Sequence, residues 1–235
     1  MKRLAYSIFA VVLLIATTSK VSAQTEQTRS VSGFNSIASA GPFNVHVKID
    51  GTESLKITGD ADILNEIETL VEDGKLEIKF KNHHYWNSNE HTGKVEVYVT
   101  AKSLSSLVNA GSGAIKVEGT VDGSDVKIIL SGSGDITSSV KSGNLEATIS
   151  GSGSIHLDGS ASEVKVRITG SGQMMGKAFK TGSASVFITG SGNVYLAADK
   201  DISAHIVGSG NVVYSGNASI EDNKTIGSGR IRKAD

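Results

Sequence analysis

The chain has 235 residues, of which 27 are glycine, one is proline and none is cysteine. Without cysteine there is no disulfide scaffold, thiolate metal site or thiol nucleophile, and abundant glycine with almost no proline excludes a collagen-like rod. Hydrophobic residues make up 38% of the chain and charged residues 20%, with a formal net charge of −1. This is enough apolar material for a packed core and argues against disorder throughout.

Residues 1–23 have the three features of a secretion signal. Lys2 and Arg3 give a basic start, an apolar run follows over residues 4–16, and small residues stand just before Gln24. We expect this segment to be a signal peptide that is removed, since the apolar run is too short for a comfortable transmembrane span. The alternative is an N-terminal membrane anchor.

After this cleavage the chain would carry 20 basic and 24 acidic residues, a net charge of about −4. Such a balance offers no electrostatic footprint for nucleic acid or for an anionic membrane. No later segment reaches the roughly 20 apolar residues of a spanning helix, and without cysteine the protein is not expected to be a lipoprotein. We therefore expect an exported protein that is periplasmic, outer-envelope associated or secreted, with no transmembrane segment after signal cleavage.

Residues 24–108 predict a strand-rich N-terminal cap with one short helix, continuous with the part that follows. Its first residues, 24–32, are polar and expected to be loose. Apolar and polar residues then alternate in four segments, which predicts strands at 43–49, 55–57, 76–80 and 95–99. Between the second and third of these strands, residues 60–73 repeat apolar side chains at helical spacing, with acidic residues to cap the start and Gly74 to stop the helix.

A polar loop over residues 82–93 of the cap holds the candidate ligand contacts, which are Tyr85, Trp86, His84 and His91. The aromatic pair could stack on a sugar or a peptide. Three histidines and Glu90 within nine residues could bind zinc or copper. Their spacing matches no metal motif, however, and adjacent His83 and His84 would face opposite ways on a strand. We therefore expect no metal and no cofactor; the alternative for the loop is a solvated segment with its tryptophan folded onto the cap.

The second part of the chain, residues 109–235, is an internal repeat. The tripeptide Gly-Ser-Gly recurs at intervals of 18–21 residues, beginning at Gly111, Gly132, Gly151, Gly170, Gly190, Gly208 and Gly227. Apolar and polar residues alternate on both sides of each copy, and one apolar position is occupied by Leu130, Ile149, Ile168, Ile188 and Ile206. A two-residue period repeated about every 19 residues is typical of a solenoid whose rungs stack about 4.8 Å apart by parallel strand pairing. The prediction is an all-β parallel β-helix whose rungs turn at Gly-Ser-Gly.

A recurrent corner explains the excess of glycine, because glycine reaches positive φ at little steric cost. A second narrow corner is marked by Gly119, Gly159 and Gly216. The serines of the tripeptides form a column that either offers a strip of hydroxyls to a ligand or satisfies the turn amides, and we favour the second. The alternating column of Lys127, Glu146 and Lys165 is expected to be a solvated face.

This arrangement resembles the head GIN domain family of auto-transporter adhesins, found chiefly in Bacteroidetes-type bacteria. The resemblance covers about residues 30–232 and rests on Phe34-Asn35-Ser36-Ile37, on Asp73-Gly74-Lys75-Leu76-Glu77-Ile78, and on Asn109-Ala110-Gly111-Ser112-Gly113 with its later copies. It implies a right-handed parallel β-helix and a place in the bacterial envelope or outside it. It carries over no catalytic residue.

Enzymatic chemistry on a β-helix would require clustered carboxylates, or a base with a calcium site, on one outer face. Asp199 and Asp201 could point the same way, but Lys200 lies between them and the preceding rung has Thr181 and Ser183 there. The sequence therefore predicts a non-enzymatic protein with adhesin-like binding of a glycan or a cell-surface protein. The alternatives are a polysaccharide-acting β-helix enzyme and a purely structural envelope scaffold.

Overall fold

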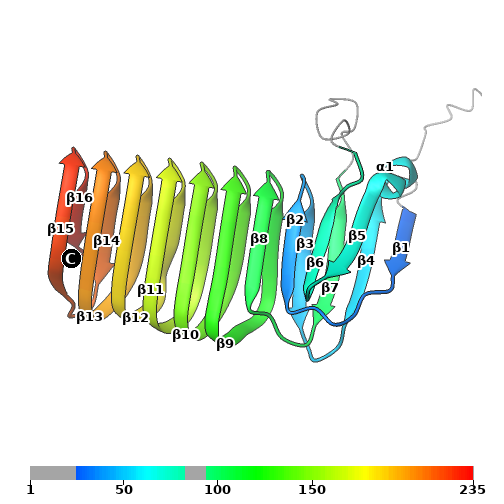
Figure 1. Ribbon diagram of the computed structural model, residues 1–235, viewed down its shortest axis with the longest axis horizontal. Coiled ribbons are helices and arrows are strands. Elements are labelled where there is room, and N and C mark those ends of the chain that lie inside the picture. The colour runs from blue at the N-terminus through cyan, green and yellow to red at the C-terminus, as the bar shows by residue number, and fades with distance from the viewer. Residues whose placement is uncertain (1–24, 83–93, 235) are drawn as a thin grey trace, which may run out of the picture.

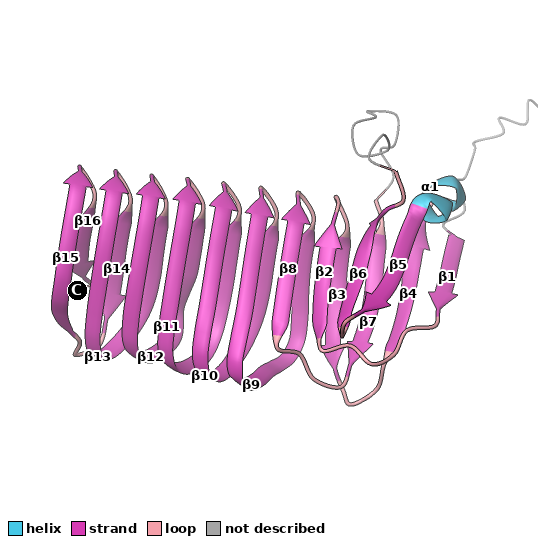
Figure 2. Cartoon of the chain, in the orientation of Figure 1, coloured by secondary structure: helices cyan, strands magenta, loops and turns pink. Residues whose placement is uncertain are grey.

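The computed structural model describes residues 25–82 and 94–234, which form one long column of stacked strands (Figure 1). The described strands, drawn as arrows in Figure 2, make a 16-stranded sheet wrapped around the column, and the described helix lies at the N-terminal end. In chain order the elements are β1 (Thr25–Arg29), β2 (Ser36–Ala40), β3 (Asn44–Ile49), β4 (Ser54–Gly59), α1 (Ala61–Glu66), β5 (Ile67–Glu72), β6 (Lys75–Phe80), β7 (Glu96–Ala101), β8 (Ser106–Gly111), β9 (Ala114–Gly132), β10 (Asp135–Gly151), β11 (Ser154–Gly170), β12 (Gln173–Gly190), β13 (Asn193–Gly208), β14 (Asn211–Ser215), β15 (Ser219–Gly227) and β16 (Arg230–Lys233).

Each of the long strands β9 to β13 makes one complete turn of the column. The first half of β9 pairs in parallel with β3, with Lys48 opposite Glu118, and its second half pairs in parallel with β8, with Gly111 opposite Gly132. The chain therefore runs along one face, turns at a bend, and returns along the other face to a Gly-Ser-Gly corner. We call these the descending face and the ascending face, and the ascending face is turned toward the viewer in Figure 1. The predicted parallel β-helix is confirmed, and its bend is the second corner, with positive φ at Gly119, Gly159 and Gly216.

The Gly-Ser-Gly corners stack directly on one another. The carbonyl oxygen of Gly132 accepts hydrogen bonds from the amides of Ser152 (3.0 Å) and Gly153 (3.1 Å) in the next rung. Gly151 has a φ of 128°, and a Cβ at this position would lie 2.3 Å from the carbonyl oxygen of Gly132. Glycine is therefore needed both for its positive φ and for the contact between backbones. The prediction that serine hydroxyls satisfy the turn amides is wrong, because the carbonyls of the preceding rung do so.

The inward side chains of the two faces meet in an aliphatic core that follows the column. The predicted ladder is buried in every rung, with exposures of 0–1% for Leu130, Ile149, Ile168, Ile188 and Ile206. Burying one such side chain contributes roughly 1.5–3 kcal/mol. In the first rung the same position is Asn109, whose side-chain nitrogen donates to the carbonyl oxygens of Gly113 (2.8 Å) and Asp135 (3.3 Å). The aliphatic ladder thus begins at a hydrogen-bonded amide that joins two corners.

The predicted helix over residues 60–73 is wrong in its second half. After α1 the chain forms β5, which pairs antiparallel with β6 and places Ile67 opposite Phe80. The turn between these strands is Asp73-Gly74, with φ of 49° and 73°. Asp-Gly with positive φ is a strong signal for a tight hairpin, and the β-branched residues that precede it favour a strand. The hairpin therefore prevails over the helical spacing of the same apolar residues.

The N-terminal end of the described column is closed by Arg29. The expectation that residues 24–32 are loose is wrong, because β1 pairs antiparallel with β4. The guanidinium of Arg29 donates to the carbonyl oxygens of Ile67 (2.7 Å) and Leu64 (2.8 Å) and to the hydroxyl of Thr69 (3.2 Å). Burial lowers the pKa of Arg29 from its usual value, but the group remains charged and its hydrogen bonds are of the strong, charge-assisted kind. They tie β1 on one face to α1 and β5 on the other.

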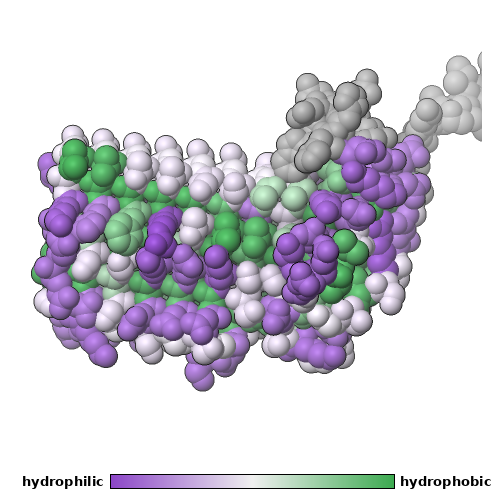
Figure 3. All heavy atoms as spheres, in the orientation of Figure 1, coloured by the Kyte–Doolittle hydropathy of each residue, from purple (hydrophilic) through white to green (hydrophobic). Residues whose placement is uncertain are grey.

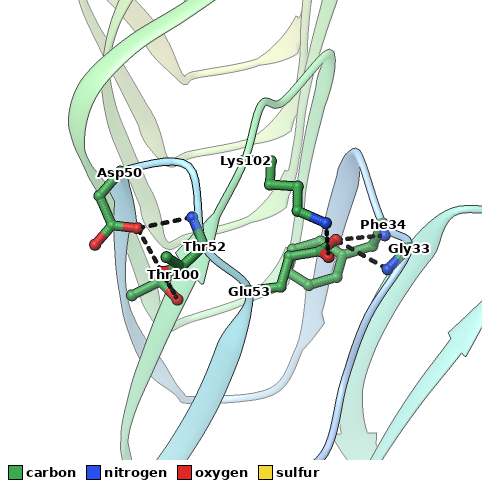
Figure 4. A network of polar contacts seen from close by, with 7 residues as sticks. All are labelled: Gly33, Phe34, Asp50, Thr52, Glu53, Thr100 and Lys102. Atoms are coloured by element: carbon green, nitrogen blue, oxygen red, sulfur yellow. Dashed lines mark hydrogen bonds and ion pairs between the residues drawn. The ribbon is translucent and has the colours of Figure 1, made fainter.

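Glu53 fastens the segment before β2 to the turn before β4. Its carboxylate accepts hydrogen bonds from the amides of Gly33 (2.9 Å) and Phe34 (3.2 Å) and from the ammonium of Lys102 (2.7 Å), as Figure 4 shows. The hydrogen bond from Lys102 lowers the pKa of Glu53 most, burial opposes this effect, and the two amides reinforce it. Phe34, held in this way, is buried in the cap.

The lowered pKa of Glu53 predicts a pH-dependent contribution to stability. A carboxyl whose folded pKa is depressed stabilises the fold fully above its unfolded pKa of about 4.3, and this contribution is lost as the pH falls through the folded value. We expect Glu53→Gln to lower the free energy of unfolding at pH 7 and to have a smaller effect at pH 3, in urea denaturation at both values. Glu118→Gln, at an exposed carboxylate, is the control and should differ little from the parent protein. An equal loss for Glu53→Gln at both pH values would contradict the assignment.

Candidate ligand-binding groove

Outward side chains on the ascending face form rows along the column, because equivalent residues of successive rungs lie about 4.8 Å apart. The strand registers place one row in the order Asp125, Asn144, Glu163, Ser183 and Asp201, which we call the first row. The second row lies two residues further along each strand and consists of Lys127, Glu146, Lys165, Ser185 and Ser203. In Figure 3 hydrophilic residues gather across the middle and lower part of this face.

A groove with a volume of about 630 Å³ lies between these two rows and crosses β9 to β13. Its floor is the strand backbone at Val126, Leu145, Val164 and Ala184, whose side chains point into the core. The walls follow from the repeat itself: side chains two residues apart on a strand point to the same side, and stacking turns each into a continuous wall. We call this the ascending groove. The Lys127, Glu146 and Lys165 column, expected to be merely a solvated face, forms one of its walls.

The first row combines paired and free polar groups. The Asn144 side chain donates to the carboxylate of Asp125 at 2.8 Å, and this bond is the largest cause of the lowered pKa of Asp125. At the other end of the groove the Ser183 hydroxyl donates to the carboxylate of Asp201 at 2.7 Å. Glu163, between these two pairs, has no side-chain hydrogen bond or ion pair within the described residues. The middle of the row therefore offers a carboxylate whose acceptor positions are open.

The second row repeats this pattern. The carboxylate of Glu146 accepts a hydrogen bond from Arg167 at 2.7 Å and lies 3.9 Å from the ammonium of Lys127. Lys165, Ser185 and Ser203 form no side-chain hydrogen bond or ion pair to any other part of the chain that the structure describes. Open donors therefore face the open carboxylate of the first row across the groove.

An aromatic side chain stands beside the second row. Phe187 is 37% exposed and lines the groove. The guanidinium of Arg167 lies over its ring at 5.8 Å from the centroid, and the ring of His205 meets it edge to face at 5.2 Å. The sequence pattern gave no signal for this cluster, because these residues occupy an outward position that is Thr148 in β10 and Ile129 in β9.

The groove offers side chains and no free strand edge. Each of β10, β11 and β12 pairs with a neighbouring strand on both sides. Their backbone donors and acceptors are therefore already used, and a ligand in the groove can be recognised only by side chains and by contact with the floor. This excludes the addition of a peptide strand to the sheet at this place.

The residues that the sequence singles out as ligand contacts, His84, Tyr85, Trp86 and His91, lie outside the described residues. They stay predictions. Asp201 lines the ascending groove, whereas Asp199 is exposed elsewhere. Within residues 25–82 and 94–234, no group of three or more histidine, aspartate or glutamate side chains could hold a metal ion.

The serine column is exposed along the edge where the corners stack, at Ser112, Ser133, Ser152, Ser171, Ser191, Ser209 and Ser228. The hydroxyls of these serines make no hydrogen bond to the rest of the described chain, since the corner amides are bonded to backbone carbonyls. No helix of the described part is long and apolar enough to cross a membrane.

The model of a family described as "Putative auto-transporter adhesin, head GIN domain" matches residues 33–218. The chain belongs to this family. The match spans the cap and the repeat up to β14, so the resemblance stated from the sequence is confirmed. A comparison with curated proteins finds no match.

Solved structures show the same fold. A "putative adhesin" from Bacteroides fragilis superimposes with a TM-score of 0.82 at 20% identity, covering 90% of this chain and 97% of that one. A "putative adhesin" from Parabacteroides merdae gives a TM-score of 0.71 at 23% identity, covering 90% and 96%. A "putative lipid binding protein" from Parabacteroides distasonis gives 0.71 at 21%, covering 90% and 97%. The family supports an adhesin-like role, and these structures show that the fold is shared.

Proposed function

We propose that this family member is an exported, non-enzymatic protein that binds an extended glycan along the ascending groove. The observation that carries the proposal is the pair of polar rows, whose central members Glu163, Lys165 and Ser185 have no partner in the described chain. Mixed carboxylate, ammonium and hydroxyl groups suit the vicinal hydroxyls of sugars, which both donate and accept hydrogen bonds.

The shape of the groove supports a linear ligand. It crosses β9 to β13, and each rung adds one polar group to each wall at a spacing of about 4.8 Å. One sugar unit of an extended glycan is close to this spacing in length, so successive sugars can meet equivalent groups on successive rungs. Phe187 adds an apolar surface on which the carbon face of a sugar can rest.

A glycan is favoured over a peptide or protein strand for a physical reason. Extended peptides gain much of their affinity by pairing with a free strand edge, and the strands beneath the groove are paired on both sides. A glycan has no backbone pairing to satisfy and is bound by side chains alone. A protein partner could contact these groups only with its side chains, because the groove offers it no strand edge. The groove is also narrow for a protein surface.

The polysaccharide-acting enzyme is the weaker alternative. A glycosidase needs one carboxyl held protonated by a raised pKa while another is ionised. Among the described residues, the pKa is lowered at Asp50, Glu53, Glu77, Glu96, Asp125 and Asp222. In the groove, the carboxylate of Glu146 is paired with Arg167. These features support binding without turnover.

The binding proposal is tested by a glycan array followed by titration of a retained oligosaccharide. Replacing both Glu163 and Lys165 by glutamine removes one open carboxylate and one open ammonium while keeping the net charge. We expect this variant to bind at least about tenfold more weakly, since each lost hydrogen bond to a charged group costs about 1.5 kcal/mol or more. Both side chains are exposed, so the thermal midpoint should stay close to that of the parent.

The matched control is the pair Asp158→Asn and Lys177→Gln, which removes one acid and one base from exposed positions on the descending face. It should bind like the parent protein. Equal weakening by control and groove variants, or an array on which no glycan is retained, would reject the ascending groove as a glycan site. Release of new reducing ends from a bound polysaccharide would show an enzyme instead.

Export is tested separately by fractionating cells that express the full chain. We expect the protein outside the cytoplasm, with Gln24 as its N-terminal residue in mass spectrometry, because the segment before it has a basic start, an apolar run and small residues. A full-length chain retained in the cytoplasm would contradict export and leave the groove proposal to its own test.

A further inference from the structure

A second groove lies on the descending face of the cap, where β4, β7, β3 and the first half of β9 are neighbours. Its volume is about 610 Å³. One wall is the row Lys56, Tyr98, His46 and Lys116, and the other is the row Ser54, Thr100, Lys48 and Glu118, as the strand registers place them. The floor consists of Leu55, Val99 and Val47. We call this the descending groove.

The first wall is a stack of aromatic and cationic side chains. The ring of His46 lies 5.1 Å from that of Tyr98 at an interplanar angle of 17°, and the ammonium of Lys56 lies 5.2 Å from the Tyr98 centroid. Tyr98 is 42% exposed, but with these neighbours it presents its hydroxyl edge rather than a free ring face. The wall therefore holds a line of hydrogen-bond donors, namely two ammonium groups, a phenol and an imidazole. The ammonium of Lys56 is also paired with the carboxylate of Glu26 at 3.2 Å, so the open ammonium of this wall is that of Lys116.

His46 is held in this wall by a carboxylate outside the groove. Its Nε2 atom lies 2.6 Å from Oε2 of Glu96, and the Asn44 side chain donates to the other oxygen at 2.9 Å. Burial alone would raise the pKa of Glu96, but the hydrogen bonds from Asn44 and His46 outweigh it and the pKa is lowered. The ionised carboxylate thus fixes the ring and leaves the outer part of the wall to a ligand.

The descending groove is basic in a chain of net negative charge. It is lined by Lys48, Lys56 and Lys116 against one acidic residue, Glu118. Lys116 is exposed and forms no ion pair within the described residues, and Lys48 approaches Asp50 only at 3.9 Å. The ascending groove has the opposite balance, with four acidic and two basic residues in its lining. The two grooves therefore select ligands of different charge.

We propose that the descending groove is a second binding site, which takes an acidic glycan whose carboxylates or sulfates lie against Lys48 and Lys116. Ammonium groups without a close partner attract such anions, and the hydroxyls of Ser54 and Thr100, 2.9 Å apart, face the sugar hydroxyls. An acidic peptide fits less well, because β4, β7 and β3 are paired on both sides and offer it no strand edge. The site stands whether or not the ascending groove binds a ligand.

The test uses tetragalacturonate, a linear chain with one carboxylate per sugar, and its methyl ester, which is the same chain without charge. Calorimetric titration of the protein is run at low and at high salt. We expect the charged chain to bind at low salt, to weaken as salt screens exposed charges, and to bind more tightly than the ester. The double variant Lys48→Gln and Lys116→Gln should bind about fivefold to tenfold more weakly, since an exposed ion pair contributes up to about fivefold.

The matched control is Lys141→Gln with Lys180→Gln, which removes the same charge from exposed positions outside both grooves. It should bind tetragalacturonate like the parent protein, and amide shifts on titration should move at Tyr98 and Lys116. Absence of binding, equal binding of the ester, or equal weakening by the control would overturn the site. If tetraglutamate binds at the same residues and as tightly as tetragalacturonate, the ligand of the site is not specifically a glycan, and that part of the proposal is wrong.

Discussion

In each rung of the repeat the carbonyl of the first corner glycine accepts one or two amides of the next corner, and the rest of the column depends on this contact. It brings backbone against backbone, so that a methyl group at Gly132 would lie 2.5 Å from the carbonyl oxygen of Gly111. Beside a corner so tight the strands that enter and leave it keep one register, and the register shifts between rungs lie around the bend. The aliphatic ladder and the outward rows are consequences of that constant register.

Because the corners fix the spacing of the rungs, the outward residues can differ from rung to rung. Inward residues carry the burial energy and the corners set the spacing, whereas the outward residues of a face touch mainly their own row. The same architecture can therefore have an acidic groove on the ascending face of the repeat and a basic groove on the descending face of the cap. This separation of stability from recognition suits a family with an adhesin-like role, because the ligand can change without a change of fold.

Much of this fold can be predicted from the sequence because the same pattern of corner glycines and alternating apolar residues recurs in every rung. Seven tripeptides at nearly constant spacing identify the rungs, and the two-residue period identifies the buried ladder without any need to know which strands pair. The cap has no such redundancy. In residues 60–73 the spacing of the apolar residues is compatible with a helix and also with a strand. Which of the two forms depends on the Asp73-Gly74 turn and on the partner strand β6, which lies later in the chain. β1 likewise becomes a strand only because β4 offers it an edge.

The grooves were harder to predict than the strands. Lys127, Glu146 and Lys165 look like an ordinary charged face in the sequence, and they become a wall only when a second row stands beside them. The row Lys56, Tyr98, His46 and Lys116 joins four strands that are far apart in the chain, in an order that no local pattern contains. Periodicity tells which side of a strand a residue faces; it does not tell which residue of another strand it stands beside.

The most direct test of the central role of the corner is the stability of Gly151→Ala beside Gly123→Ala. At Gly151 the φ of 128° and the 2.3 Å approach to Gly132 both oppose a side chain, and we expect the free energy of unfolding to fall by about 3 kcal/mol. At Gly123, on the bend, the nearest atom to a Cβ is 3.8 Å away, and we expect a change within about 0.5 kcal/mol. Equal stabilities of the two variants in urea denaturation would show that the stacked corner does not hold the column together.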